Sequence, residues 1–162
     1  MTIYALKYII FFVMGSVISY IDVNSRKIPD YLSLPLIFIG FIFACVSDEL
    51  DIQQAIIGAV FGFFVFFLIA FVYQKVTKDQ GLGGGDIKYL AGIGAFTGIV
   101  GVIFVIFFSS IFALIFLIII VVRNRKINHK KEQGYGVLPY APFLTFSVFI
   151  YIIFKNLLTK FV

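Results

Sequence analysis

One nearly unbroken apolar stretch, residues 87–122, limits the folds open to this chain more than any other feature. Lys88 is its only charged residue. A helix needs about 20 apolar residues to cross a bilayer, so the stretch is too long for one crossing, and Gly98 and Gly101 offer a place to turn. Of the 162 residues, 62% are apolar or aromatic, against about 45–50% in soluble domains. We therefore predict an integral membrane protein, with the lipid bilayer as the solvent for much of its surface.

Four further apolar runs complete the predicted architecture. They extend over residues 3–21, 31–46, 55–73 and 137–154. With the long stretch split in two, we predict an all-α polytopic fold of six transmembrane helices in a single domain, residues 1–162. The apolar N-terminus has no clear cleavage site before Asp22, so we interpret it as a retained span rather than a signal peptide.

The basic residues predict the orientation of these spans. If six spans alternate, the loops after the first, third and fifth lie on one side. That side holds ten basic residues and the other holds three. The ten are Arg26, Lys27, Lys75, Lys78, Lys88, Arg123, Arg125, Lys126, Lys130 and Lys131, and the three are Lys7, Lys155 and Lys160. Because basic residues collect in cytoplasmic loops, we predict a multi-pass plasma-membrane protein with both termini outside. The net charge of +5 then needs no nucleic acid as a partner.

Few side chains of this sequence offer a route to hydrolysis at membrane depth. The His-Glu-x-x-His pattern of zinc proteases is absent, and the only histidine, His129, lies in the basic loop, away from Ser109 and Ser110. Cys45 is the only cysteine and has no base near it in the sequence, so it forms neither an internal disulfide nor a Cys-rich zinc site. We expect no metal and no organic cofactor. A pair of carboxylates that share a proton and activate water remains.

Asp22 and Asp86 are the candidates for such a pair. Asp22 ends the first apolar run, where the helix C-terminus makes a carboxylate mildly unfavourable; the alternative is a plain interfacial acid. Asp86 follows three glycines and opens the fourth span; the alternative is an ordinary helix N-cap. Two spans separate them, so both face the cytoplasmic side. A fourth span that ends near Gly98 covers only about 18–20 Å of a hydrocarbon core of about 30 Å, which would bring Asp86 below the membrane surface, where acids are usually functional.

Three motifs occur at the ends of the predicted spans. Residues 22–30 are Asp-Val-Asn-Ser-Arg-Lys-Ile-Pro-Asp, residues 83–88 are Gly-Gly-Gly-Asp-Ile-Lys, and residues 138–143 are Leu-Pro-Tyr-Ala-Pro-Phe. In this order they resemble the first catalytic loop, the Gly-x-Gly-Asp signature and the Pro-Phe-x-Pro-Phe start of the last span in the type IV prepilin and preflagellin peptidases. That family consists of intramembrane aspartyl peptidases, and the resemblance covers essentially the whole chain.

The resemblance implies an aspartic endopeptidase that removes the short basic leader from type IV pilin-like precursor proteins. The cut falls on the cytoplasmic side of the precursor's apolar helix, usually after a glycine. Asp22 and Asp86 carry over as the catalytic pair, supported by the motif residues Gly83, Gly85, Lys88 and Pro29. The Cys-x-x-Cys segment and the N-terminal region of the larger, bifunctional members are absent, which implies a short form without N-methyltransferase activity.

For some charged residues near these motifs, two interpretations remain open. Asp30 and Asp79 are either solvated loop acids or contacts for the basic leader. Lys88 either anchors a helix at the interface or favours the ionised form of Asp86. Because a helix C-terminus disfavours a carboxylate and a helix N-terminus favours one, we expect Asp86 to be the ionised base and Asp22 the protonated acid.

Two functions other than proteolysis remain open to a chain with these residues. In a small transporter or channel, Asp22 and Asp86 would bind a cation or relay protons. In a non-catalytic assembly protein, the Gly-rich helix would dock a partner, and Asp→Asn changes would be tolerated. Leader cleavage by the purified protein separates both from a peptidase.

Overall fold

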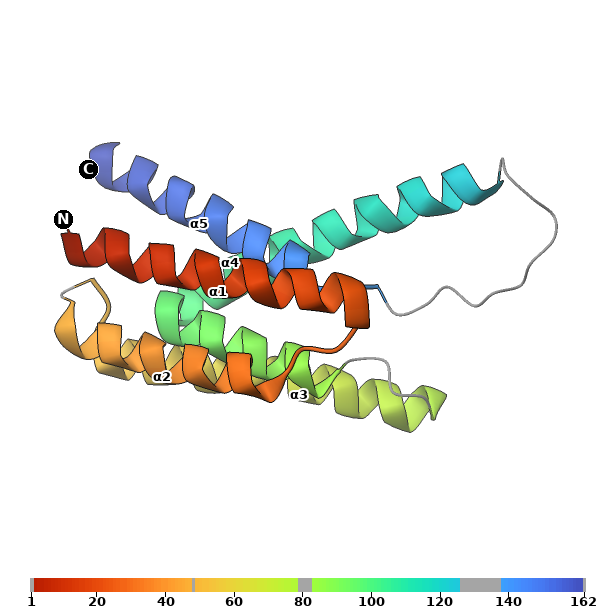
Figure 1. Cartoon of the computed structure of the whole chain (residues 1–162), viewed down its shortest axis with the longest axis horizontal. Helices are drawn as coiled ribbons and strands as arrows, with labels where there is room; N and C mark the ends of the chain where they lie inside the picture. Colours follow the sequence, from red (N-terminus) through yellow and green to blue (C-terminus); the bar gives the residue numbers. More distant parts are fainter. Residues whose placement is uncertain (1, 48, 79–82, 126–137, 162) are drawn as a thin grey trace.

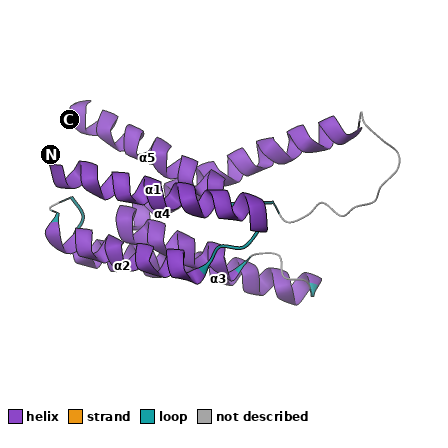
Figure 2. Cartoon of the chain, in the orientation of Figure 1, coloured by secondary structure: helices purple, strands orange, loops and turns teal. Residues whose placement is uncertain are grey.

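The computed structural model of the chain describes residues 2–47, 49–78, 83–125 and 138–161, which form five α-helices (Figure 1). The helices are α1 (Thr2–Ser25), α2 (Asp30–Val46), α3 (Ile52–Thr77), α4 (Gly84–Arg125) and α5 (Ala141–Phe161). The described residues between them form loops and turns (Figure 2). The predicted all-α fold is therefore confirmed for the part of the chain that the structure describes.

Four segments within these helices are long and apolar enough to cross a membrane. They are Ile3–Ser25, Ile52–Thr77, Gly84–Arg123 and Ala141–Leu158, and α2 is a shorter apolar helix. The outer faces of the helices carry exposed large apolar side chains, among them Ile9, Val60 and Phe107. Apolar surface on this scale requires a solvent other than water, which agrees with the prediction of a multi-pass membrane protein.

The long helix α4 reverses its direction at Gly98. Gly98 has φ 71° and ψ −176°, a backbone conformation that glycine adopts far more readily than other residues. Contacts between α4 and α5 follow this reversal. Tyr89, before Gly98, contacts Thr145 near the start of α5, and Phe104, after Gly98, contacts Phe154 farther along α5. Phe116, later in α4, again contacts a residue near the start of α5, Phe143. The two parts of α4 therefore run in opposite directions, as Figure 1 also shows. The predicted break in the apolar stretch is confirmed at Gly98, whereas Gly101 is helical.

The part of α4 before Gly98 forms the centre of the bundle. Its side chains are among the most buried of the described residues, including Tyr89, Leu90 and Ile93. It packs closely against α3, because a Cβ added to Gly94 would collide with the carbonyl oxygen of Gly58. Such backbone contact is the usual role of small residues between membrane helices. This segment is therefore enclosed by its neighbours.

Several helix ends differ from the predicted apolar runs. The helix α1 continues to Ser25, so Asp22 lies in its last turn rather than at the start of a loop. The helix α3 extends from Ile52 to Thr77 instead of over 55–73, and α5 begins at Ala141, four residues after the predicted start. Polar turns at a helix end keep helical hydrogen bonds without adding hydrophobicity, so an apolar run gives an inaccurate helix boundary.

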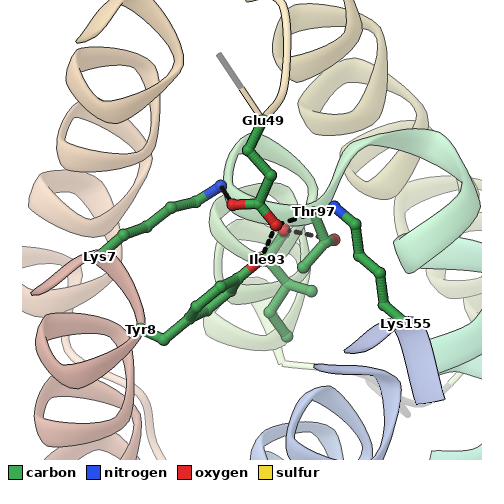
Figure 3. Close-up of polar contacts among 6 residues, drawn as sticks. All are labelled: Lys7, Tyr8, Glu49, Ile93, Thr97 and Lys155. Carbon is green, nitrogen blue, oxygen red and sulfur yellow. Dashed lines mark hydrogen bonds and ion pairs between the residues drawn. The ribbon is translucent and has the colours of Figure 1, made fainter. Parts of the chain in front are cut away.

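A buried cluster of charged side chains joins the helices at the end of the bundle that holds the N-terminus (Figure 3). Glu49, between α2 and α3, accepts hydrogen bonds from Lys7 (3.1 Å), Lys155 (2.8 Å) and the hydroxyl of Tyr8. The side chain of Lys7 is only 1% exposed. Burial alone would raise the pKa of Glu49, but the hydrogen bonds from Lys155 and Tyr8 and the charge of Lys7 outweigh it and hold the pKa below its usual value.

We expect Glu49→Gln to lower the free energy of unfolding by about 3 kcal/mol, because it leaves the buried Lys7 ammonium without a counter-charge. Since the folded-state pKa of Glu49 lies below its unfolded value of about 4.3, the stabilisation is complete above that value and disappears as the pH falls through the folded-state pKa. The free energies of unfolding of the variant and the wild type should therefore differ by the whole amount at pH 7 and become equal in stronger acid.

Thermal unfolding of the purified protein in one detergent, followed by circular dichroism, measures this difference. The matched control is Asp51→Asn, since Asp51 precedes α3 at the same end, is exposed, and makes no side-chain cap hydrogen bond. Equal melting temperatures for the two variants at pH 7 would contradict the assignment of a stabilising role to Glu49.

Candidate active site

Asp22 and Asp86 lie at the same end of the bundle, opposite the Glu49 cluster. Asp22 is in the last turn of α1 and Asp86 is in the first turn of α4 (Figure 1). The two side chains are close enough for the charge of Asp22 to act on Asp86. Asp22 is buried and Asp86 is half-buried. The fold thus brings together the two carboxylates that the sequence singles out.

The loop that follows α1 packs directly on the first turn of α4. A Cβ on Gly85 would lie 2.6 Å from Cβ of Ile28 and 2.8 Å from its carbonyl oxygen. The residue after Ile28, Pro29, has φ −74° and ψ 138° and leads into α2. A Cβ on Gly84, in contrast, would meet no atom within 4 Å. Of these two glycines at the start of α4, Gly85 is therefore the one at which a side chain would separate the helix from the loop.

The start of α5 forms a third side of the site. The backbone N–H of Ala141, the first residue of α5, donates a hydrogen bond of 2.9 Å to Oδ2 of Asp22. The backbone N–H of Tyr140 acts on the same carboxyl group. N–H groups at a helix start have no partner within the helix and carry partial positive charge. The motif at residues 138–143 thus supplies donors to Asp22, which the sequence alone did not predict.

Pro142 is the sequence signal that could have suggested this contact. Proline is favoured in the first turn of a helix, so Pro142 predicts that α5 begins at this point and presents free N–H groups. The sequence does not reveal that these groups point at Asp22, since the contact joins residues 119 positions apart.

The carboxyl group of Asp86 has fewer donors around it. The backbone N–H of Gly83 acts on this group, but Oδ1 is buried and has no hydrogen-bond partner among the described residues. A buried ionised oxygen without a donor is costly, and a protonated carboxyl group is less so. The described hydrogen-bond donors thus gather at Asp22 rather than at Asp86, an arrangement that the termini of α1 and α4 alone do not suggest.

The other residues predicted for the site lie beside it or outside the described part of the chain. Lys88 forms an ion pair of 2.7 Å with Asp30, and both side chains are largely at the surface. This pair joins the start of α2 to α4 beside the site. Gly83 lies in open surroundings apart from the Asp86 carboxylate. Asp79 lies outside the described residues. Among the residues that the structure describes, no group of three His, Cys, Asp or Glu side chains is arranged to hold a metal ion.

Comparison with known proteins shows which family this sequence matches. The sequence profile of the type IV leader peptidase family matches residues 9–118. A prepilin leader peptidase/N-methyltransferase from Neisseria gonorrhoeae is 36% identical over 133 residues, which cover 82% of this chain and 43% of that protein. The protein of the same name from Pseudomonas aeruginosa is 30% identical over 143 residues, or 88% of this chain and 47% of that protein. The chain thus spans about half the length of the relatives that it matches. No solved structure matches the chain.

We expect Gly85→Ala to lower the free energy of unfolding by about 1–3 kcal/mol, the usual cost of inserting a methyl group into a filled space. The new Cβ must displace Ile28, and the displacement should loosen the contact between the loop after α1 and the first turn of α4. Thermal unfolding in detergent measures the effect.

Gly84→Ala is the matched control, since its Cβ enters open space next to the same helix start. This variant should unfold within about 0.5 kcal/mol of wild type, as surface substitutions generally do. If the two alanine variants proved equally stable, the proposed contact between Gly85 and Ile28 would be wrong.

Proposed function

Because the chain belongs to the type IV leader peptidase family, we propose that it is an aspartic endopeptidase that removes the basic leader from type IV pilin-like precursors. Asp22 and Asp86 are its catalytic pair. The observation that supports this most strongly is the convergence of Asp22, Asp86 and the start of α5 at one end of the bundle. Two carboxylates that interact in a partly buried site are the arrangement that aspartic peptidases use to activate water.

The proposed reaction is general acid–base hydrolysis without a covalent intermediate. Ionised Asp22 accepts a proton from a water molecule while the water oxygen attacks the scissile carbonyl carbon. Protonated Asp86 donates its proton to the carbonyl oxygen, which gives a neutral tetrahedral diol. Asp22 then passes its proton to the leaving nitrogen as the carbon–nitrogen bond breaks, and one diol hydroxyl returns a proton to Asp86.

The division of roles follows from the hydrogen-bond donors around each carboxylate. The backbone N–H groups of Ala141 and Tyr140 stabilise negative charge on Asp22, and hydrogen bonds from the protein to a charged group favour the charged form. Asp86 has a buried oxygen without a donor among the described residues. Asp86 therefore keeps the shared proton and serves as the general acid of the pair.

The membrane arrangement that fits this chemistry has six crossings in one domain, residues 1–162. Two of them are the parts of α4 on either side of Gly98. The first part, residues 84–98, is about 20 Å long at 1.5 Å per residue, so Asp86 lies below the membrane surface. The same end of the bundle holds Arg26 and Lys27, just after α1, and Lys75 in the last turn of α3. By the positive-inside rule, this end faces the cytoplasm and both termini lie outside.

Asp30 is the acidic residue that would contact the basic leader beside the site. The carboxylate of Asp30 is 60% exposed and pairs with Lys88. Exposed ion pairs contribute little free energy, so a lysine or arginine of the leader can replace Lys88 at low cost. Asp79, the other acid expected to contact the leader, belongs to the same proposal. A transporter or channel role has no comparable support, since the family of this chain is named for its peptidase activity.

Asp22→Asn and Asp86→Asn should each reduce leader cleavage by about 10²–10⁴-fold, because each removes one proton-transfer group. The assay combines the purified variant, in detergent or liposomes, with a pilin-like precursor and follows the shortened product on a gel. Asp51→Asn, at the opposite end of the bundle, is the control and should cleave at the wild-type rate. Wild-type processing by either of the first two variants would sink the proposal.

Infrared spectroscopy of the protein with labelled aspartate carboxyl groups tests the division of roles at neutral pH. The wild-type spectrum minus that of Asp86→Asn should contain a protonated carboxyl band. The corresponding difference for Asp22→Asn should contain an ionised carboxylate band. The reverse pattern would overturn the assignment of base and acid but leave the peptidase proposal intact, since the pair shares one proton in either case.

A further inference from the structure

Three hydroxyl groups meet inside the bundle, one helical turn from Asp22 and Asp86. Oγ1 of Thr145, on α5, lies 2.7 Å from the hydroxyl of Tyr89 on α4 and 2.8 Å from Oγ of Ser19 on α1. It also lies 2.9 Å from the carbonyl oxygen of Ala141. A hydroxyl group has one proton to donate and can accept two. Thr145 therefore donates to a carbonyl oxygen, that of Ala141 being nearer than that of Gly15 at 3.4 Å, while Tyr89 and Ser19 donate to Thr145.

Each partner of Thr145 is linked to one side of the candidate active site. Ser19 lies three residues before Asp22 on α1, and Tyr89 lies three residues after Asp86 on α4. Residues three apart on a helix share a face. The backbone of Ala141 is held on both sides of its Cα, because its carbonyl oxygen accepts from Thr145 and its N–H donates to Asp22. Thr145 is thus the junction between the three elements that form the site.

The space on the Tyr89 side of this junction is filled, whereas Ser19 and Thr145 also line a pocket that opens to the surface. The side chain of Tyr89 is 0% exposed, and among the described residues its hydroxyl has Thr145 as its hydrogen-bond partner. A Cβ on Gly15 would lie 2.8 Å from the Tyr89 hydroxyl and 3.0 Å from Cγ2 of Thr145. A buried hydroxyl that loses its partner is costly. Loss of the Thr145 hydroxyl would therefore make Tyr89 and the first turn of α4 shift.

We propose that Thr145 is a positioning residue for the catalytic pair. Its hydroxyl orients the backbone of Ala141, whose N–H binds Asp22, and it holds Tyr89, which fixes the turn of α4 that carries Asp86. Thr145 has no contact with the reacting atoms and acts through these two neighbours. The inference rests on the proposed peptidase function and adds a third helix, α5, to the parts that determine the geometry of the pair.

The direct test compares Thr145→Val, which keeps the side-chain shape without the hydroxyl, with Thr145→Ser, which keeps the hydroxyl. Misplacement of a catalytic group by about 1 Å lowers the rate about 100-fold. We expect Thr145→Val to reduce kcat for leader cleavage by about 10- to 100-fold with KM within about threefold of wild type. Thr145→Ser should restore most of kcat, and Tyr89→Phe should lower kcat as Thr145→Val does.

Infrared difference spectra provide a second measurement that does not depend on activity. The Asp22 band, taken as wild type minus Asp22→Asn, should shift in the Thr145→Val background and return to its position with Thr145→Ser. An unshifted band and an unchanged kcat in Thr145→Val would overturn the inference, as would equal losses of kcat in the valine and serine variants. Should Asp22→Asn remain active, the peptidase proposal fails on its own, and the infrared shift still decides whether Thr145 positions Asp22.

Discussion

The reversal of α4 at Gly98 is the constraint on which the rest of the structure depends. Its positive φ of 71° allows one apolar stretch to fold into two antiparallel segments, and the contact of Gly94 with Gly58 holds the first of them at the centre of the bundle. Because the second segment leads back, α5 can begin at the end where α1 finishes. Without that reversal, Ala141 could not reach Asp22, and the short segment that carries Asp86 would not start beside α1.

The electrostatics of the site follow from this arrangement of helix ends. Asp22 lies at the C-terminus of α1, where the helix opposes negative charge, but also at the N-terminus of α5, whose N–H groups favour it. The hydrogen bond of 2.9 Å from Ala141 acts more directly than the diffuse field of α1. At the far end, Glu49 holds Lys7 and Lys155 together. Among the residues that the structure describes, the charged side chains thus gather at the two ends of the bundle, and the interior between them is mostly apolar.

Much of this fold follows from the sequence, because apolar runs, glycines and prolines act locally. The five helices, the break near Gly98 and the location of Asp22 and Asp86 at one end could be predicted from such signals. The contacts of Ala141 with Asp22, of Thr145 with Tyr89 and of Glu49 with Lys7 could not, since each depends on how distant helices pack. For the same reason, the division of roles expected from single helix termini differs from the one that we propose from the donors around each carboxyl group.

The most direct test of the central claim, that Asp22 and Asp86 face one another, is a crosslinking measurement in membranes. In a Cys45→Ser background, Asp22→Cys is combined with Asp86→Cys and treated with a short bifunctional thiol reagent. The control pairs Val23→Cys with Asp86→Cys, since Val23 follows Asp22 in the chain but is 54% exposed on the surface of α1. The structure predicts rapid crosslinking of the first pair and slow crosslinking of the control. Equal rates, or no crosslink between positions 22 and 86, would contradict it.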